Sequence, residues 1–257
     1  MFARALSRSA LVVFLSVVVW LFLVPTPGLA KDDVHFVYNF KPGSSQKFEI
    51  DFGQETSFSG RNYVFLSEME LTETCIEIEE SGLFKMEVTF IEVSSSMRMN
   101  DKLIDNKMDE VLVGQTLGYR VNKIGEVSDI RPKSYIEGWR QFSQVLDALI
   151  NGWYPELPDS TIGVGGNWVC LDTTETMRED QRVTMITRVV CQFEEMTKEK
   201  GRQCAKIKGE GASHIDGEKE NKFEFEYCFD PKEVGIVKFK AKIEGESQTI
   251  ELKKELK

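Results

Sequence analysis

The sequence predicts a mainly β fold, in which a curved antiparallel sheet forms a half-barrel or a sandwich with one central amphipathic helix. Two patterns favour this fold. Along most of the chain apolar and polar residues alternate, and a period of two gives each strand one dry face and one wet face. In one segment apolar residues recur every three or four positions, which is the period of a helix that buries one side.

Alternation is clearest in four segments of the chain. The residues that share the apolar face of each segment are Phe84, Met86, Val88 and Phe90; Val183, Met185, Val189, Cys191 and Phe193; Phe223, Phe225, Tyr227 and Phe229; and Val237, Phe239, Ala241 and Ile243. Turn sequences such as Glu80-Ser81-Gly82 separate about ten or eleven strand-like segments in all.

The predicted helix spans residues 134–151. Its apolar stripe consists of Tyr135, Trp139, Phe142, Leu146 and Leu149. Ser134, followed three positions later by Glu137, forms a capping box, and Asn151-Gly152 gives a typical C-terminal end. The helix joins two β-rich parts, residues 31–131 and 160–257, which we expect to form a single domain over residues 31–257.

The N-terminus predicts export. Arg4 and Arg8 precede an apolar run over residues 10–24, and the small-residue end Gly28-Leu29-Ala30 follows, which is the layout of a signal peptide covering residues 1–30. The mature chain would then be periplasmic or secreted and would have no membrane span, since no later segment is apolar enough to cross a bilayer. The alternative is an uncleaved N-terminal segment that anchors the protein.

Charge excludes one class of partner. The chain carries 32 basic and 42 acidic residues, a formal charge of −10, and removal of Arg4 and Arg8 with the signal peptide would bring it to −12. A nucleic-acid binder needs a basic face to displace phosphate counterions. We therefore expect no nucleic-acid partner.

Register matching predicts the arrangement of the C-terminal strands. If the strand that ends at Gly209 pairs with the strand that starts at Lys222, apolar residues face apolar residues and opposite charges face each other. In that register Cys204 lies opposite Cys228.

A second hairpin, turning at residues 179–182, sets Cys170 opposite Cys191. Because an exported chain reaches an oxidising compartment, we expect two disulfides, Cys170–Cys191 and Cys204–Cys228. The alternative is that these cysteines are reduced and act as small buried hydrophobes. Cys75 is left over and is expected in the core.

The sequence predicts no catalytic residue, no metal site and no cofactor. The two histidines, His35 and His214, lack the clustered partners that metal binding or general-base catalysis needs. Asp101, Asp105 and Asp109 recur every four residues but do not follow the ligand pattern of a calcium loop, so a solvated, charged connector is expected there.

One feature points to binding. A curved sheet and a helix rich in aromatic residues can enclose an apolar groove, and grooves of this kind hold lipids or hydrophobic peptides. The residues that would line the groove are Trp139, Phe142, Leu146, Trp153 and Tyr154. The alternative is an ordinary core, in which the helix fills the concave face of the sheet.

The motif Gly118-Tyr119-x-Val121-x-x-x-Gly125-x-Val127 precedes the predicted helix, and Leu157-Pro158 and Val164-Gly165-Gly166-Asn167-Trp168 follow it. In these motifs the chain resembles, over most of residues 40–250, a family of bacterial exported β-rich proteins of unknown function. The last block of that family usually reads valine, glycine, aspartate, a small residue and tryptophan, whereas Gly166-Asn167 replaces the middle pair here. The resemblance implies an extracytoplasmic location and supplies no catalytic residues. Many members are similar to lipoproteins, but this chain has no cysteine near the cleavage point.

Three hypotheses of function remain at this stage. The first is a non-enzymatic envelope protein that binds a partner protein or serves as a scaffold. The second is a carrier or sensor of lipids or other hydrophobic ligands, with the helix as a lid over an apolar cavity. The third is an enzyme such as a hydrolase, which the missing acid–base constellation disfavours.

Overall fold

The computed structural model describes residues 33–257 apart from 59, 106, 179–180, 216–219, 233–234 and 246–247, so the predicted signal peptide lies outside it. The strands and helices, in chain order, are β1 Val34–His35, β2 Ser45–Phe58, β3 Arg61–Ile78, β4 Phe84–Met99, β5 Lys102–Ile104, α2 Met108–Leu112, β6 Thr116–Val121, β7 Val127–Pro132, α3 Trp139–Gly152, β8 Thr161–Ile162, β9 Asn167–Arg178, β10 Gln181–Glu199, β11 Arg202–Ile215, β12 Asn221–Asp230, β13 Gly235–Glu244 and β14 Gln248–Leu256.

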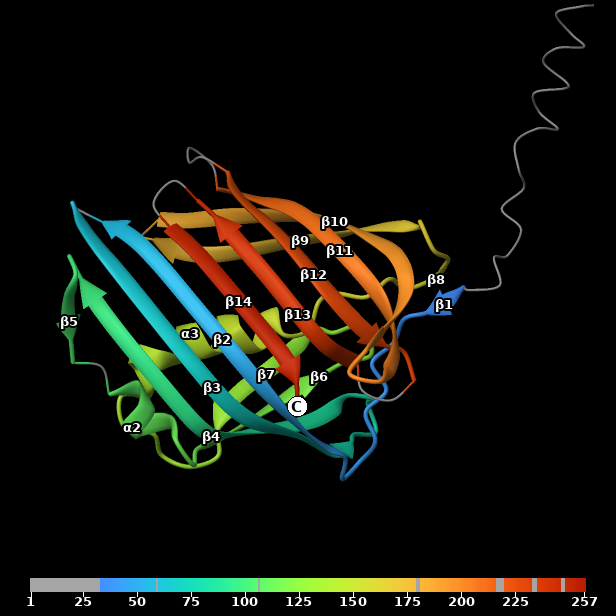
Figure 1. The fold of residues 1–257 in the computed structure, drawn as a ribbon, viewed down its shortest axis with the longest axis horizontal. Helices are drawn as coiled ribbons and strands as arrows, with labels where there is room; N and C mark the ends of the chain where they lie inside the picture. The colour runs from blue at the N-terminus through green and yellow to red at the C-terminus, as the bar shows by residue number, and fades with distance from the viewer. Residues whose placement is uncertain are drawn as a thin grey trace, which may run out of the picture.

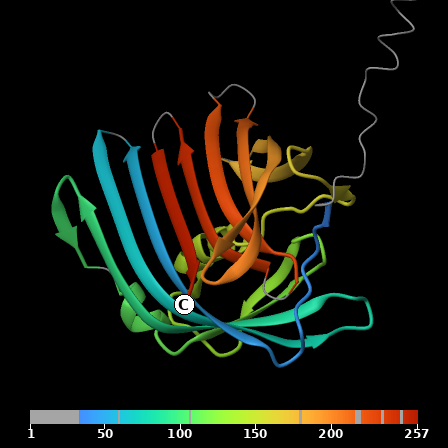
Figure 2. The same cartoon turned by 45° about the vertical axis from the view of Figure 1, so that its right-hand side comes forward.

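Twelve of these strands form one antiparallel sheet, in the order β7-β6-β4-β3-β2-β14-β13-β12-β11-β10-β9, with β5 attached to β4. The two β-rich parts of the chain join where β2 pairs with β14, for example at Ile50 and Lys254 (Figure 1). The sheet curls but stays open within the described residues, with β7 at one edge and β9 at the other (Figure 2). The predicted fold class, a curved antiparallel sheet around one central helix, is confirmed.

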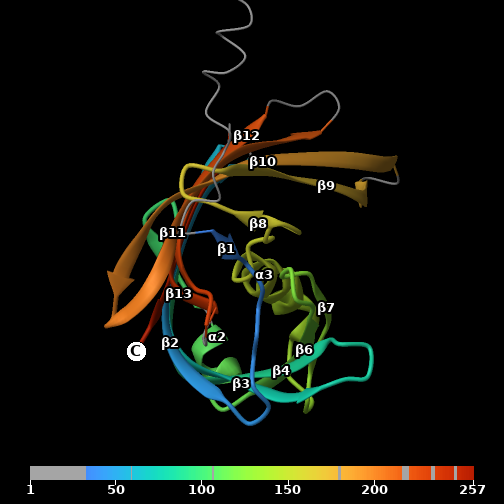
Figure 3. The same ribbon diagram turned by 90° about the vertical axis from the view of Figure 1, so that its right-hand side faces the viewer.

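Helix α3 connects the two edges of the sheet and lies inside its curve (Figure 3). It begins at Trp139, five residues later than predicted. The capping-box prediction is wrong, because the Ser134 hydroxyl donates instead to the side-chain oxygen of Gln115, at 2.9 Å. Gly138 has a φ of 72°, and this left-handed residue directly precedes the helix. Tyr135 consequently lies outside the helix and is 88% exposed.

A short second helix replaces the connector that the sequence predicts as solvated. Helix α2 carries Asp109 and Glu110 in its first turn, where carboxylates suit the helix dipole. It buries Met108 and Leu112 against the core. The sequence pattern does not predict this helix, because its two buried apolar residues are too few to show a helical period.

The chain enters the fold through an extended N-terminal segment. Phe36, Tyr38 and Phe40 are buried in alternation, and this segment crosses the end of the half-barrel that faces the viewer in Figure 3. Phe36 packs against Phe193 with ring centroids 5.3 Å apart, and Tyr38 packs against Tyr154 at the same separation. The segment therefore closes that end of the sheet with aromatic side chains.

The predicted strand registers are wrong by two residues. Cys228 lies opposite Lys206, and Cys170 lies opposite Val189. A shift of two residues leaves every side chain on its own face, so alternation alone does not distinguish the two registers. The observed register sets Phe225 opposite Gly209, and the ring occupies the space in which a Cβ of that glycine would lie.

Candidate functional site

A cavity of about 670 Å³ lies between α3 and the concave face of the sheet. Helix α3 contributes Val145, Leu149, Asn151 and Gly152, and the segment after it contributes Pro155 and Glu156. The other lining residues include Phe52 and Gln54 of β2, Cys170 of β9, Thr187, Val189 and Cys191 of β10, Phe223, Glu224 and Phe225 of β12, Phe239, Ala241 and Ile243 of β13, and Ile250 and Leu252 of β14. A mostly apolar wall with a few polar groups is typical of small-molecule sites, and the volume falls in their usual range.

The sheet side of the cavity consists of two neighbouring rows of inward-facing residues that run across the strands. The first cavity row is Gln54, Ile250, Ile243, Phe223, Gly211, Val189 and Cys170. The second cavity row is Phe52, Leu252, Ala241, Phe225, Gly209 and Cys191. The short side chain of Ala241 leaves room in the middle of the wall, and the apolar side chains that the helix presents opposite are those of Val145 and Leu149.

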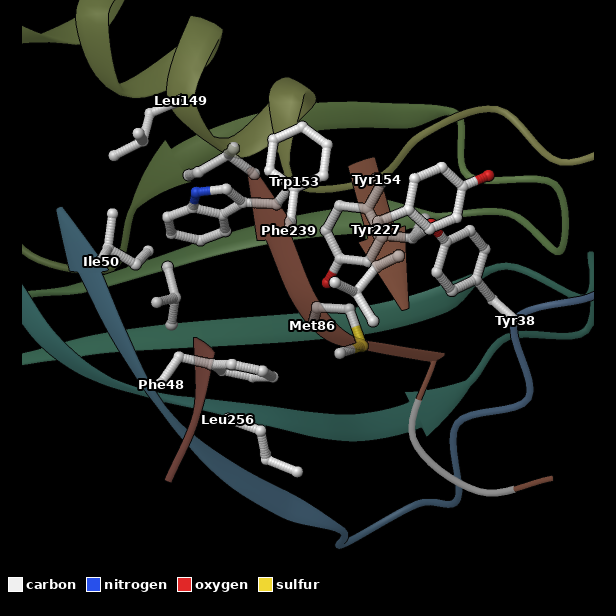
Figure 4. Packing of buried hydrophobic residues seen from close by; sticks show 14 of the residues in the cluster. Tyr38, Phe48, Ile50, Met86, Leu149, Trp153, Tyr154, Tyr227, Phe239 and Leu256 are labelled. Atoms are coloured by element: carbon white, nitrogen blue, oxygen red, sulfur yellow. The ribbon is translucent and has the colours of Figure 1, made fainter. Parts of the chain in front are cut away.

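The next row inward is packed and forms the floor of the cavity. Its members are Ile50, Lys254, Phe239, Tyr227, Ile207 and Phe193. Trp153, at the end of α3, is completely buried above this row (Figure 4). The helix is therefore anchored by close packing of Trp153, while Val145, Leu149, Asn151 and Gly152 of the helix border the hollow.

Four of the five predicted groove residues do not line the cavity. Leu146, Trp153 and Tyr154 are core residues, and Trp139 is partly buried against the core. The side chain of Phe142 lies outside the described part of the structure. A wide apolar stripe predicts that a helix is buried on one side, but it does not show which residues of the stripe meet solid packing and which meet a hollow.

A buried ion pair, which the sequence did not lead us to expect, lies beside the floor of the cavity. Lys254 Nζ is 3.6 Å from Glu73 Oε1, and both side chains are almost fully buried. The hydroxyls of Tyr119 and Tyr154 donate to the same Glu73 oxygen, at 2.6 and 2.8 Å. The signal was present in the sequence, because Glu73 and Lys254 interrupt the apolar faces of their strands.

Aromatic rings surround the ammonium group of Lys254. Its Nζ lies 4.0 Å from the centroid of the Phe48 ring and 4.8 Å from that of Trp153. Burial lowers the pKa of Lys254, while the nearby carboxylate of Glu73 acts in the opposite direction. Burial also raises the pKa of Tyr119 and of Tyr154 well above the ordinary value, and the charge of Glu73 adds to both shifts.

All five cysteines are buried free thiols in this structure. Cys170 and Cys191 both line the cavity and are diagonal neighbours across β9 and β10. The pKa of Cys191 is raised, first by its hydrogen bond with Cys170 and then by burial. The pKa of Cys204 is raised to about 11 by burial, with Cys228 adding to the shift. Each predicted pair is thus in proximity, and the two disulfides remain predictions.

The described residues contain no group of three or more His, Cys, Asp and Glu side chains arranged to hold a metal ion. Among the same residues no helix is long and apolar enough to span a membrane.

Comparison with known proteins adds little to this picture. No protein-family model matches the chain, and no curated protein matches it either. Among solved structures, a candidate exported protein with a YmcC-like fold from Bacteroides fragilis is similar at 10% identity and a TM-score of 0.28, over 85% of this chain and 98% of that one. Likeness at this level carries no argument about the function of this chain.

Proposed function

We propose that the protein binds a hydrophobic ligand in the cavity beneath α3 and acts as a carrier or sensor of that ligand. The observation that carries the proposal is the hollow itself. Val189 and Leu252 from the sheet face Val145 and Leu149 from the helix across a space that no described side chain fills. An apolar surface of this kind is stabilised when a ligand removes it from water.

Helix α3 is suited to act as a cover for the cavity. Its C-terminal end is fixed by the buried Ile150 and Trp153. Its N-terminal end follows the left-handed Gly138, at which the chain direction changes. Movement of the N-terminal turns would widen the cavity while the packed end stayed in place.

The place of action that we propose is extracytoplasmic, either periplasmic or secreted. Cleavage after Ala30 would leave the mature chain starting just ahead of β1 at Val34. If the segment were not cleaved, the same junction would tether the β1 end of the half-barrel to the membrane. We propose a binding role and no enzymatic one, since the cavity wall is mostly apolar.

A second candidate, an envelope scaffold, is favoured by one surface feature. Val169 and Leu171 of β9 are 53% and 66% exposed, and Ile186 and Val190 of β10 lie beside them on the outer face. Exposed apolar patches of this kind mark interaction sites. The cavity supports the ligand-binding role more directly, because a scaffold does not need a hollow interior.

Displacement of an uncharged fluorescent probe, N-phenyl-1-naphthylamine, tests the proposal with a matched pair of variants. Val189 lines the cavity and Val190 is on the outer face of the same strand. We expect Val189→Glu to weaken probe binding by about tenfold or more, because a carboxylate in an apolar cavity is unfavourable. Val190→Glu should bind the probe as the unaltered protein does.

A second variant separates loss of binding from loss of folding. Val189→Trp fills the cavity without adding charge, so the chain should unfold at a similar temperature while probe binding falls. Equal probe binding by Val189→Glu, Val189→Trp and Val190→Glu would contradict the proposal.

A further inference from the structure

The head group of the ligand can be inferred from the row of residues next to the cavity. Beyond the first cavity row, the inward-facing positions of the same strands form a rim row: Thr56, Gln248, Asn221, Ser213 and Thr187. Each of these side chains is partly exposed, and Thr187 also lines the cavity. The inner face of the sheet therefore changes from apolar to polar between one inward-facing residue of a strand and the next.

The rim row is polar without being charged. Its members offer hydroxyl and amide groups, which both donate and accept hydrogen bonds. Gln54, at the end of the first cavity row, donates to Thr56 at 3.2 Å and so belongs to the same polar layer. These groups match an alcohol, an ester or an amide, but none of them neutralises an ionic head group.

The charged residues beside the rim row point the other way. They are the exposed residues Glu55, Arg188, Lys222 and Glu244, which alternate with the rim residues along the strands. The sheet thus keeps its charges on the outer face at this level.

An anionic head group finds no basic partner at the cavity. Neither the described lining residues nor the rim row includes a lysine or an arginine. The whole chain also carries a formal charge of −10. A free fatty acid or an anionic lipid would therefore place its charge among apolar and uncharged polar groups of an acidic protein.

We infer, on the basis of the proposed function, that the ligand is a single-chain amphipath with an uncharged, hydrogen-bonding head group, such as a monoacylglycerol, a long-chain alcohol or a fatty amide. The alkyl chain occupies the two cavity rows. The head group lies among Thr187, Ser213 and Asn221, where water and hydroxyl groups share its hydrogen bonds.

Four probes of equal chain length test the inference on the full chain: monolaurin, ionised laurate, dodecyltrimethylammonium and dodecane. Each competes with N-phenyl-1-naphthylamine. Monolaurin should displace the fluorophore at concentrations about tenfold or more below those needed for laurate and for dodecyltrimethylammonium. Dodecane, which has no head group, reports on the cavity alone.

Three variants test whether the rim row sets the preference. The double substitution Ser213→Ala with Asn221→Ala should reduce the affinity for monolaurin several-fold relative to dodecane, because hydrogen-bond partners of the head group are removed. Lys222→Ala, on the outer face beside Asn221, should leave the ratio unchanged. Asn221→Lys should raise the affinity for laurate, since it supplies the cation that the rim lacks.

The outcomes distinguish this inference from the proposed function. Equal or tighter binding of laurate or dodecyltrimethylammonium, or an unchanged monolaurin-to-dodecane ratio in the double variant, overturns the uncharged head group and leaves cavity binding intact. Failure of every probe, dodecane included, overturns both the head group and the ligand-binding function.

Discussion

Lys254 of β14 reaches across the ring of Phe48 in β2 to Glu73 of β3, so that a buried ion pair joins the C-terminal strand to the N-terminal half of the chain. Tyr119 of β6 and Tyr154, which follows α3, donate to the same carboxylate. One oxygen of Glu73 therefore holds together β14, β6 and the segment that anchors the helix. A buried pair of this kind need not add net stability, but it strongly penalises the loss of either partner.

Removal of one partner should be far more harmful than removal of both. We expect Lys254→Met to lower the free energy of unfolding by about 3–5 kcal/mol, because Glu73 is left as an unpaired buried charge. Lys254→Met combined with Glu73→Gln should recover a large part of this loss. Urea denaturation of both variants and of the unaltered protein measures these losses.

Lys253→Met is the matched control for this prediction. Lys253 adjoins Lys254 on the outer face and is paired with Asp51 at 3.3 Å in a partly exposed position. Its loss should lower the free energy of unfolding by less than about 1 kcal/mol. Equal losses from Lys253→Met and Lys254→Met would show that the buried pair has no special role.

Two buried tyrosines should respond in opposite ways to removal of the hydroxyl. Tyr119→Phe loses a hydrogen bond to a charged carboxylate, so the free energy of unfolding should fall by about 1.5–3 kcal/mol. The hydroxyl of Tyr227 has no hydrogen-bond partner among the described residues. Tyr227→Phe should therefore be neutral or stabilising, as thermal unfolding would show, whereas a loss as large as that of Tyr119→Phe would indicate a partner for Tyr227.

Alkaline pH should destabilise the protein. Burial raises the pKa of Tyr38, Tyr119, Tyr154 and Tyr227 well above 10.0. The unfolded chain loses these protons near pH 10 and the folded chain keeps them, so their contribution is complete below about pH 10 and is lost as the pH rises further. The pKa of Lys254 is lowered, which acts in the opposite direction, but four tyrosines outweigh one lysine.

The expected result is a steep fall of the urea midpoint above about pH 10. Tyr227→Phe should make the fall shallower, because one of the four groups is removed. A midpoint that stays level from about pH 9 to pH 11 would contradict the prediction.

Oxidation should link the cysteines in the predicted pairs. Since Cys170 and Cys191 lie diagonally across β9 and β10, and Cys204 and Cys228 lie diagonally across β11 and β12, peptide mapping without reductant should find the links Cys170–Cys191 and Cys204–Cys228 in the protein purified from its own source. Each disulfide should add about 2–4 kcal/mol to the free energy of unfolding. A Cys170–Cys204 link would contradict the assigned strand neighbours.

Alternation was sufficient to predict the fold class. Alternating residues such as Phe223, Phe225 and Tyr227 predict which side chains face inward, and the structure places the first two in the cavity wall and Tyr227 in the core. The register was not accessible in the same way, because a slip of two residues keeps every face unchanged. The contact that separates the two registers, Phe225 over Gly209, involves a glycine, which has no side chain to contribute to a pattern of apolar residues.

The site was harder to predict than the fold. The helix stripe correctly predicted burial of Leu146 and Leu149. The hollow, however, lies beside Val145 and Leu149, and which side of the apolar stripe faces it depends on the packing of the surrounding residues. The ion pair joins positions that are 181 residues apart in the sequence, Glu73 and Lys254. Each interrupts an apolar face on its own strand, but their pairing is visible only once β2 lies between β3 and β14.

Native mass spectrometry of the protein, purified from its own source without detergent, tests the central claim most directly. The account predicts an additional non-covalent mass corresponding to a single-chain lipid, present in the unaltered protein and in Val190→Glu, and absent from Val189→Trp. A bare protein mass throughout, or an adduct that persists in Val189→Trp, would contradict the claim that the cavity beneath α3 is the binding site.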